Sequence, residues 1–223
     1  HDTKLIQTIW LRNLLSYGPK SQRVALGPLN VLIGPNASGK SNLIQALSIL
    51  QAIPTDVARP IREGGGVSEW IWKGPGKRSA ASITAAVACP FGEMPLRYRL
   101  GFSGPQGKFA ILDENVQTHH RLKGYGRPYR FYDLNDGAPL VSVHTAEGTP
   151  PGTNQGREER RLERGEIDPT RSVLSQRKDP FSYPEITYLG EVFSKIHIYL
   201  DRVFSLEAAG SPQKTDLRSE FLE

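Results

Sequence analysis

The stretch of sequence that decides the fold is Gly34-Pro35-Asn36-Ala37-Ser38-Gly39-Lys40-Ser41. It matches the pattern of glycine, four residues and then Gly-Lys-Ser, which is typical of loops that bind phosphate. Residues 29–33 before it form an apolar run, which predicts a buried strand. Residues 43–53 after it carry an apolar stripe at helical spacing, and Pro54 predicts the end of that helix. A strand, a glycine loop and a helix in this order are the context that the pattern requires.

Each fixed position of this loop has a physical role in binding a nucleoside triphosphate. The two glycines, Gly34 and Gly39, allow the backbone to wrap around a phosphate with its N–H groups pointing inward. The start of the helix adds its positive dipole end. Lys40 supplies a charge to the β- and γ-phosphates, and the Ser41 hydroxyl is a natural Mg²⁺ ligand. The predicted nucleotide-binding residues are Gly34, Pro35, Asn36, Ala37, Ser38, Gly39, Lys40, Ser41 and Asn42.

Composition places few limits on function. The 223 residues contain 28 basic and 23 acidic side chains, a net charge of +5, which suits polyphosphate or nucleic acid but is common in other proteins. A single cysteine, Cys89, excludes an internal disulfide and a zinc cluster. This fits a reducing cytoplasm, where we expect the protein to act. No run of 18 apolar residues is present, so we expect no membrane span.

Patterning along the chain predicts an α/β fold with an antiparallel strand-rich lobe. Successive strands without helices between them favour antiparallel pairing, and Gly-Pro and Asn-Asp-Gly turns separate several of them. The strands are expected at 5–15, 23–26, 29–33, 82–89, 96–102, 109–113, 129–134 and 140–144. A helix is expected to begin at Pro184, followed by a strand at 196–200. We expect four segments: a nucleotide-binding core (1–80), the strand lobe (81–145), a flexible charged insert (146–170) and a helical segment leading toward a further half of the protein (171–223). Residues 56–76 are expected to be irregular.

The charged insert leaves two interpretations open. Arg160, Arg161 and Arg164 could contact nucleic acid. The neighbouring acidic residues Glu158, Glu159 and Glu163 neutralise them, which favours a solvated charged face, with a short helical piece around 157–164.

The loop and its surroundings resemble the ABC-type ATPase heads of the SMC and RecF kind. The matching residues are Ile9, Leu11, Asn13, the Ser16-Tyr17 turn and 29–42, with Leu14 where those proteins usually have Phe. Within that group the chain is similar to ATPases related to overcoming-lysogenization-defect (OLD) nucleases and bacterial defence systems. The stretches that carry this second likeness are Glu63-Gly64-Gly65-Gly66, Leu174-Ser175-Gln176 and Tyr183-Pro184-Glu185.

The resemblance implies a two-lobed head that works in pairs, with two ATP molecules between two facing heads. It implies action in DNA maintenance or phage defence, and DNA as a partner. A glutamine at the lobe junction would complete the Mg²⁺ shell; Gln176 is the candidate, against the alternative of a surface glutamine. We expect the chain to be the N-terminal part of an ATPase that hydrolyses ATP only with a C-terminal half and a second head.

One acidic pair resembles the metal-binding strand end that hydrolysis requires. Residues 109–112 are apolar and are followed by Asp113 and Glu114. The Gly-Pro turn before this run favours an antiparallel hairpin with residues 96–102, with both acids facing solvent, so no catalytic residue is assigned. Two alternatives stay open: a self-contained P-loop kinase or NTPase that uses Asp113 and Glu114, and a nucleotide-regulated binding module without turnover.

Overall fold

The computed structural model describes residues 5–27, 29–35, 38–76, 79–92, 94–124, 126–135, 138–147, 149–163 and 165–198. Asn36, Ala37, Arg164 and the segment 199–223 therefore lie outside the described residues. Of the strand expected at 196–200, residues 196–198 are described and form no strand.

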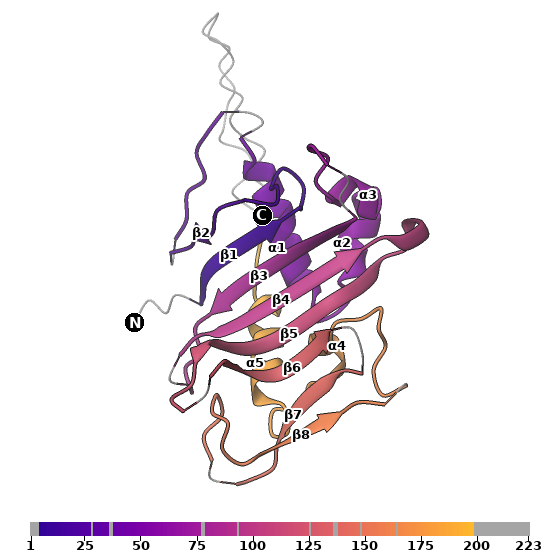
Figure 1. Cartoon of the computed structure of the whole chain (residues 1–223). Coiled ribbons are helices and arrows are strands. Elements are labelled where there is room, and N and C mark those ends of the chain that lie inside the picture. The colour runs from indigo at the N-terminus through magenta and orange to yellow at the C-terminus, as the bar shows by residue number, and fades with distance from the viewer. Residues whose placement is uncertain are drawn as a thin grey trace, which may run out of the picture.

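A single eight-stranded sheet organises the described part of the chain (Figure 1). Its order is β2-β1-β3-β4-β5-β6-β7-β8, and every neighbouring pair is antiparallel. The strands are β1 (Ile6–Arg12), β2 (Val24–Ala25), β3 (Ala80–Val87), β4 (Leu96–Ser103), β5 (Ala110–Arg121), β6 (Pro128–Asn135), β7 (Leu140–His144) and β8 (Arg157–Arg161). The antiparallel prediction is confirmed, including the hairpin of β4 and β5, which a short 3-10 turn (Pro105–Gly107) connects.

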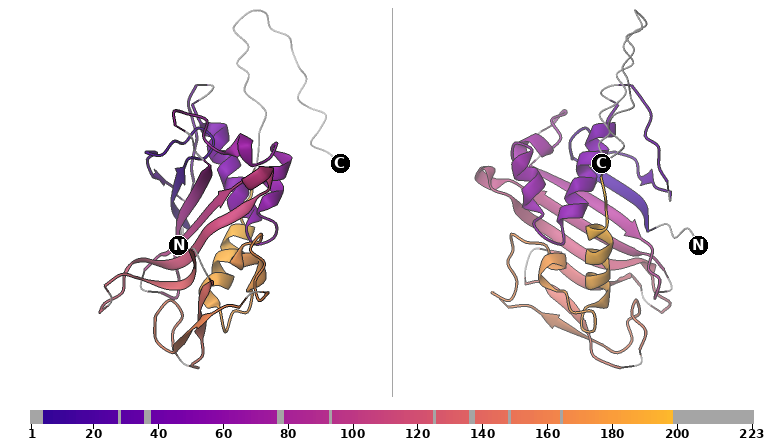
Figure 2. Two further views of the ribbon diagram at one scale, coloured as in Figure 1. Left: turned by 45° about the vertical axis from the view of Figure 1, so that its right-hand side comes forward. Right: turned by 180° about the vertical axis from the view of Figure 1, so that it is seen from behind.

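The helices gather on one face of this sheet (Figure 2). They are α1 (Lys40–Ala52), α2 (Ala58–Glu63), α3 (Val67–Trp70), α4 (Val173–Gln176) and α5 (Pro184–Ser194). In the view from behind, α1 and α5 lie across the strands, while the opposite face of the sheet is turned toward the viewer in Figure 1. Two predictions are confirmed here: α1 ends just before Pro54, and α5 begins at Pro184, where proline suits the first helical turn.

Cross-strand register explains which side chains form the core. Residues that pair across a sheet point to the same face, and neighbours along one strand point to opposite faces. One paired row runs from β1 to β6 and is buried throughout: Ile9, Ala85, Tyr98, Val116 and Tyr132. The next row of this face, from Leu11 through Ile83 and Leu100, reaches Glu114, which is also buried. The buried and mostly apolar side chains of these strands therefore point toward the helices.

The structure differs from the sequence-based expectations in three segments. Residues 29–33 are not a strand, and their side chains are exposed. The segment 56–76 contains the two short helices α2 and α3. In the insert 146–170, residues 157–161 form the edge strand β8 and not a helical piece, because they pair with all five residues of β7.

The boundary drawn at residue 80 falls at the first residue of β3, a strand inside the sheet. Strands from both sides of that boundary pair with each other along six positions of β1 and β3. No helix in the described part of the chain is long and apolar enough to cross a bilayer.

Candidate functional site

The glycine loop meets α1 at a residue whose backbone suits only glycine. Gly39 caps the helix with φ of 91°, in the left-handed region. A Cβ atom there would lie 3.2 Å from the Ser16 Oγ, so the turn after β1 packs directly on the loop. The Tyr17 hydroxyl donates a long hydrogen bond of 3.5 Å to the Gly39 carbonyl. Ser16 and Tyr17 were noted in the sequence as part of the family resemblance, but their contact with Gly39 follows only from the structure.

The beginning of the loop is equally tight. A Cβ atom at Gly34 would lie 2.9 Å from the Ser38 Oγ, closer than real side chains approach one another. The Ser38 N–H donates to the Pro35 carbonyl at 3.3 Å, which closes a turn over the loop. Both glycines of the motif therefore lie in close contact with serine side chains. That they also let the backbone wrap around a phosphate stays a prediction.

Lys40 lies over the loop that it belongs to. Its ammonium donates to the carbonyl oxygens of Gly34 and Pro35, the latter at 2.7 Å, and to the Ser38 Oγ at 3.2 Å. These acceptors are neutral, so a phosphate oxygen would offer the ammonium a stronger, charge-assisted partner. The lysine is thus positioned at the loop with its charge uncompensated by any carboxylate of the described residues.

The N-terminal end of α1 is open to an anion. It has no acidic residue in its first turn, and no side chain caps it. The first backbone N–H groups of a helix have no partner within the helix, and the dipole there is positive. Ser41 in this turn is exposed, and its hydroxyl makes no hydrogen bond within the described residues, so it is free to act as a metal ligand. Among those residues no group of three or more His, Cys, Asp or Glu side chains could hold a metal ion.

A family profile described as "AAA domain, putative AbiEii toxin, Type IV TA system" matches residues 29–183, more than half of the chain. The chain belongs to this family. The match begins at the apolar approach to the glycine loop, includes strands β3 to β8 and ends just before α5, while β1 and β2 precede it. Membership in this AAA-domain family agrees with the predicted P-loop ATPase fold and with ATP as the nucleotide.

Other comparisons add little to the AAA-domain assignment. A solved structure from a study of ATP-driven dimerization and DNA-stimulated activation of SMC ATPases is 19% identical, with a TM-score of 0.39. The overlap covers 56% of this chain and 72% of that chain, and at this TM-score it supports no argument about function. No curated protein sequence matches the chain.

Gln176 lies at the end of α4, and its amide group is used to fasten a loop of its own lobe. The side-chain oxygen accepts from the Asp168 N–H at 2.6 Å, and the nitrogen donates to the Asp168 and Arg171 carbonyls. α4 packs against α5 near Gly190. Gly190 also lies close to Pro54, which follows the C-terminal end of α1, the end remote from the glycine loop. A 13-residue helix is about 20 Å long, so this conformation does not bring Gln176 to the loop. The role of Gln176 as a Mg²⁺ ligand stays a prediction, and it requires a conformation in which Gln176 lies close to the glycine loop.

Asp113 and Glu114 point to opposite faces of β5, and neither lies in a parallel strand beside the loop. Asp113 pairs with Arg99 at 2.6 Å on the face away from the helices. The Glu114 carboxylate is fully buried, so the expectation that both acids face solvent is wrong for Glu114. It accepts from the Tyr98 hydroxyl at 2.6 Å, from the Ser172 hydroxyl and from the Val173 N–H at 2.9 Å. Burial raises its pKa, and the hydrogen bonds partly oppose that shift.

This buried network was not predicted, because its members come from three distant parts of the sequence. Tyr98 and Glu114 lie on neighbouring strands, while Ser172 caps α4, its side chain accepting from the Leu174 N–H. The alternation of β5 does place Glu114 on the core face, so the pattern contained a signal for burial. Nothing in the sequence indicated which donors would meet it.

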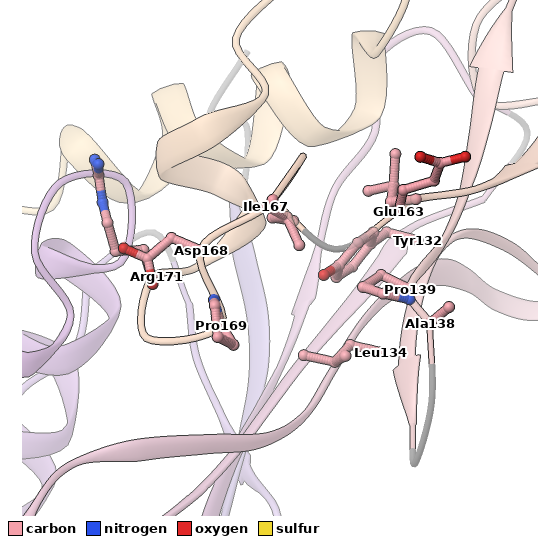
Figure 3. Close-up of a pocket in the computed structure, with 11 residues that line it drawn as sticks. Tyr132, Leu134, Ala138, Pro139, Glu163, Ile167, Asp168, Pro169 and Arg171 are labelled. Carbon is pink, nitrogen blue, oxygen red and sulfur yellow. The ribbon is translucent and has the colours of Figure 1, made fainter.

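A mainly apolar pocket of about 660 Å³ lies between β6, residues 138–139 before β7, and lining residues from the segment 162–171 (Figure 3). Tyr132 and Leu134 form its sheet side, and Ile167 and Pro169 its opposite side. The contacts of Gln176 with Asp168 and Arg171 hold that segment, so Gln176 shapes this pocket in the structure.

Proposed function

We propose that the chain binds Mg-ATP through residues 34–42 and forms part of an ATPase head that completes its hydrolytic site with other protein surface. The observation that supports this best is the open N-terminal end of α1, with Lys40 held at the glycine loop. The helix end offers N–H donors and positive potential, and the lysine adds a full charge to the same anion. In this proposal the exposed Ser41 hydroxyl binds Mg²⁺, which would neutralise phosphate charge.

The proposal includes a partner because the apolar approach to the loop is uncovered. Leu29, Val31 and Ile33 are 84%, 72% and 89% exposed. A run of large apolar side chains at this exposure is typical of an interaction surface. We infer that a C-terminal half of the ATPase covers residues 29–33, and that a second head meets the loop across bound ATP.

Hydrolysis by the isolated chain is not expected. The acidic pair at the end of the apolar run in β5 is divided between an ion pair with Arg99 and a buried network. An activating base must be within hydrogen-bonding reach of the attacking water, directly or through one water molecule. This geometry disfavours a self-contained kinase that uses Asp113 and Glu114. Cytoplasmic action in DNA maintenance or phage defence, and kinship with the OLD-related ATPases, complete the proposal.

The test is Mg-ATP binding and phosphate release by this chain, measured by calorimetry and a phosphate assay, for the wild type, Lys40→Ala and Lys178→Ala. Lys178 is an exposed lysine on a loop after α4 and matches the charge change. We expect binding in the wild type and in Lys178→Ala, a loss of at least about tenfold in Lys40→Ala, and no turnover in any of them. Repeating the titration with EDTA is expected to weaken binding through loss of Mg²⁺.

Two results would contradict the proposal. Unchanged ATP affinity in Lys40→Ala would remove the nucleotide site. Steady phosphate release by the chain alone, lost in Glu114→Gln but retained in Asp133→Asn, would favour the self-contained enzyme instead.

A further inference from the structure

The face of the sheet opposite the helices carries polar side chains in three aligned rows. The rows follow from strand register, since paired residues share a face. The first is Trp10, Thr84, Arg99, Asn115 and Asp133; the second is Thr8, Ala86, Arg97, Gln117 and Arg130; the third is Arg12, Ser82, Gly101, Asp113 and Asn135. We call this surface the open face; it is turned toward the viewer in Figure 1.

The open face is hollowed and basic. Two adjoining hollows of about 100 and 330 Å³ share Arg97 and Arg99 in their linings. Arg23, from the loop before β2, lines the first hollow, and Arg130 lines the second. With Arg12 in the third row, five arginines face two aspartates.

The aspartates leave three of these arginines without an acidic partner. Asp113 pairs with Arg99, and Asp133 pairs with Arg130 three positions earlier on the same strand. Arg12, Arg23 and Arg97 form no ion pair with any carboxylate in the described ranges. The centre of the open face therefore holds uncompensated positive charge.

Arg97 experiences electrostatic repulsion from neighbouring arginines when no anion is bound. Its guanidinium is half-buried, and burial together with the nearby charges of Arg23 and Arg99 lowers its pKa. Like charges gathered in a partly buried hollow repel one another, and a bound anion would relieve that repulsion.

Side chains that can contact nucleic-acid bases lie beside the arginines of the open face. The guanidinium groups of Arg12 and Arg23 lie 5.2 and 5.4 Å from the centroid of the Trp10 ring. The buried His119 Nδ1 has no hydrogen-bond partner among the described residues, and it lines the same hollow as Trp10. Arginine planes and aromatic rings stack on exposed bases, and imidazole nitrogens hydrogen-bond to base edges.

We propose that the open face binds a nucleic-acid strand, with Arg23, Arg97 and Arg12 contacting its phosphates. Guanidinium forks match the geometry of phosphate oxygens. Arg97 lines both hollows and Arg23 lines the first, so a strand that follows the hollows passes both guanidinium groups. An acidic protein segment would use the same charges, and competition by polyglutamate distinguishes it from nucleic acid in the experiment.

This inference gives the proposed function a DNA-facing surface, and it rests on that function only for the choice of DNA as the probe. The open face and the glycine loop use separate residues. Binding to the open face can therefore be measured without ATP, and failure of either proposal is distinguishable from failure of the other.

The experiment is fluorescence anisotropy of a labelled single-stranded DNA oligonucleotide and of its duplex, without nucleotide, at several salt concentrations. The test variant is Arg23→Gln with Arg97→Gln. The control is Arg59→Gln with Arg171→Gln, which removes the same charge from exposed sites on α2 and on the loop before α4. We expect the test variant to weaken binding of the single strand at least about tenfold and to reduce the salt slope by about 1.4. The control is expected to stay within about twofold, since its arginines lie outside the open face.

A further variant, Thr84→Glu, keeps the proposal testable where the arginine variant does not fold. It places a carboxylate in the first row between Trp10 and Arg99 and is expected to weaken binding as well. The proposal is overturned if neither DNA binds at low salt or if the control loses as much affinity as the test variant. It is also overturned if polyglutamate competes as well as unlabelled DNA, which would favour an acidic protein. Preference for the duplex would overturn the single-strand base contacts assigned to Trp10 and His119.

Discussion

Two regions of this molecule reverse the usual relation between polarity and burial. Residues 29–33 are apolar, lead into the glycine loop and are largely exposed. By contrast, Glu114 in β5 and Glu185 in α5 are polar and buried, at 0% and 1% exposure. An exposed apolar run indicates surface that something else covers, whereas a buried carboxylate persists only when donors surround it.

The buried carboxylates show how the second region is satisfied. Glu185, in the first turn of α5, accepts from the Gly152 N–H and forms an ion pair with Arg157 of β8, whose guanidinium also stacks on Phe131. Both partners of this pair are only 1% exposed. The pair therefore joins the insert to the helix layer, which explains why part of a charged segment is ordered as an edge strand.

The largest expected effect comes from breaking that ion pair. Glu185→Ala leaves the Arg157 charge buried without a partner, and we expect a loss of about 3–5 kcal/mol in unfolding free energy, measured by urea denaturation. The double variant Arg157→Met with Glu185→Leu is expected to lose less, because it removes both charges. If Glu185→Ala lowers the unfolding free energy by less than about 1 kcal/mol, the ion pair between Arg157 of β8 and Glu185 of α5 is not formed in solution.

A matched isoleucine pair tests the contrast directly. Ile83 is fully buried in β3, and Ile33 is 89% exposed. Ile83→Ala is expected to cost about 2–5 kcal/mol through lost packing and a cavity, whereas Ile33→Ala should change stability by less than about 0.5 kcal/mol. If both cost the same in urea unfolding of the isolated chain, residues 29–33 are buried and the proposed partner surface is wrong.

The smallest effect is a pH dependence that belongs to Glu114. Burial raises its folded pKa above the value in the unfolded chain, so its favourable contribution is complete below the unfolded pKa and is lost as pH rises through the folded pKa. We expect Glu114→Gln to gain stability relative to the wild type as pH rises above about 4.5, by about 1.4 kcal/mol for each unit between the two pKa values. The amide also places an N–H₂ among three donors, which adds a constant cost at every pH. A difference between the two proteins that does not change with pH would contradict this account.

Much of the fold was accessible to sequence reasoning because local signals were strong. Alternating strands, the turn between β4 and β5, and the prolines at 54 and 184 predicted the antiparallel sheet and the limits of α1 and α5. The glycine loop was identified by its spacing alone. The short helices α2 and α3 were missed, because one or two helical turns carry too little periodicity to be distinguished from irregular chain.

Some residues of the candidate sites could be predicted from the sequence, and the roles of others appear only in the structure. Lys40 and Ser41 follow from a motif whose chemistry lies within eight consecutive residues, so the sequence by itself was enough to predict a phosphate site there. Only the tertiary structure decided that Gln176 fastens a loop, that Glu114 is buried and that Arg23 joins Arg97 on the open face. The physical reason is that a repeat along a strand specifies which residues share a face, while register and the covering layer determine what each face meets.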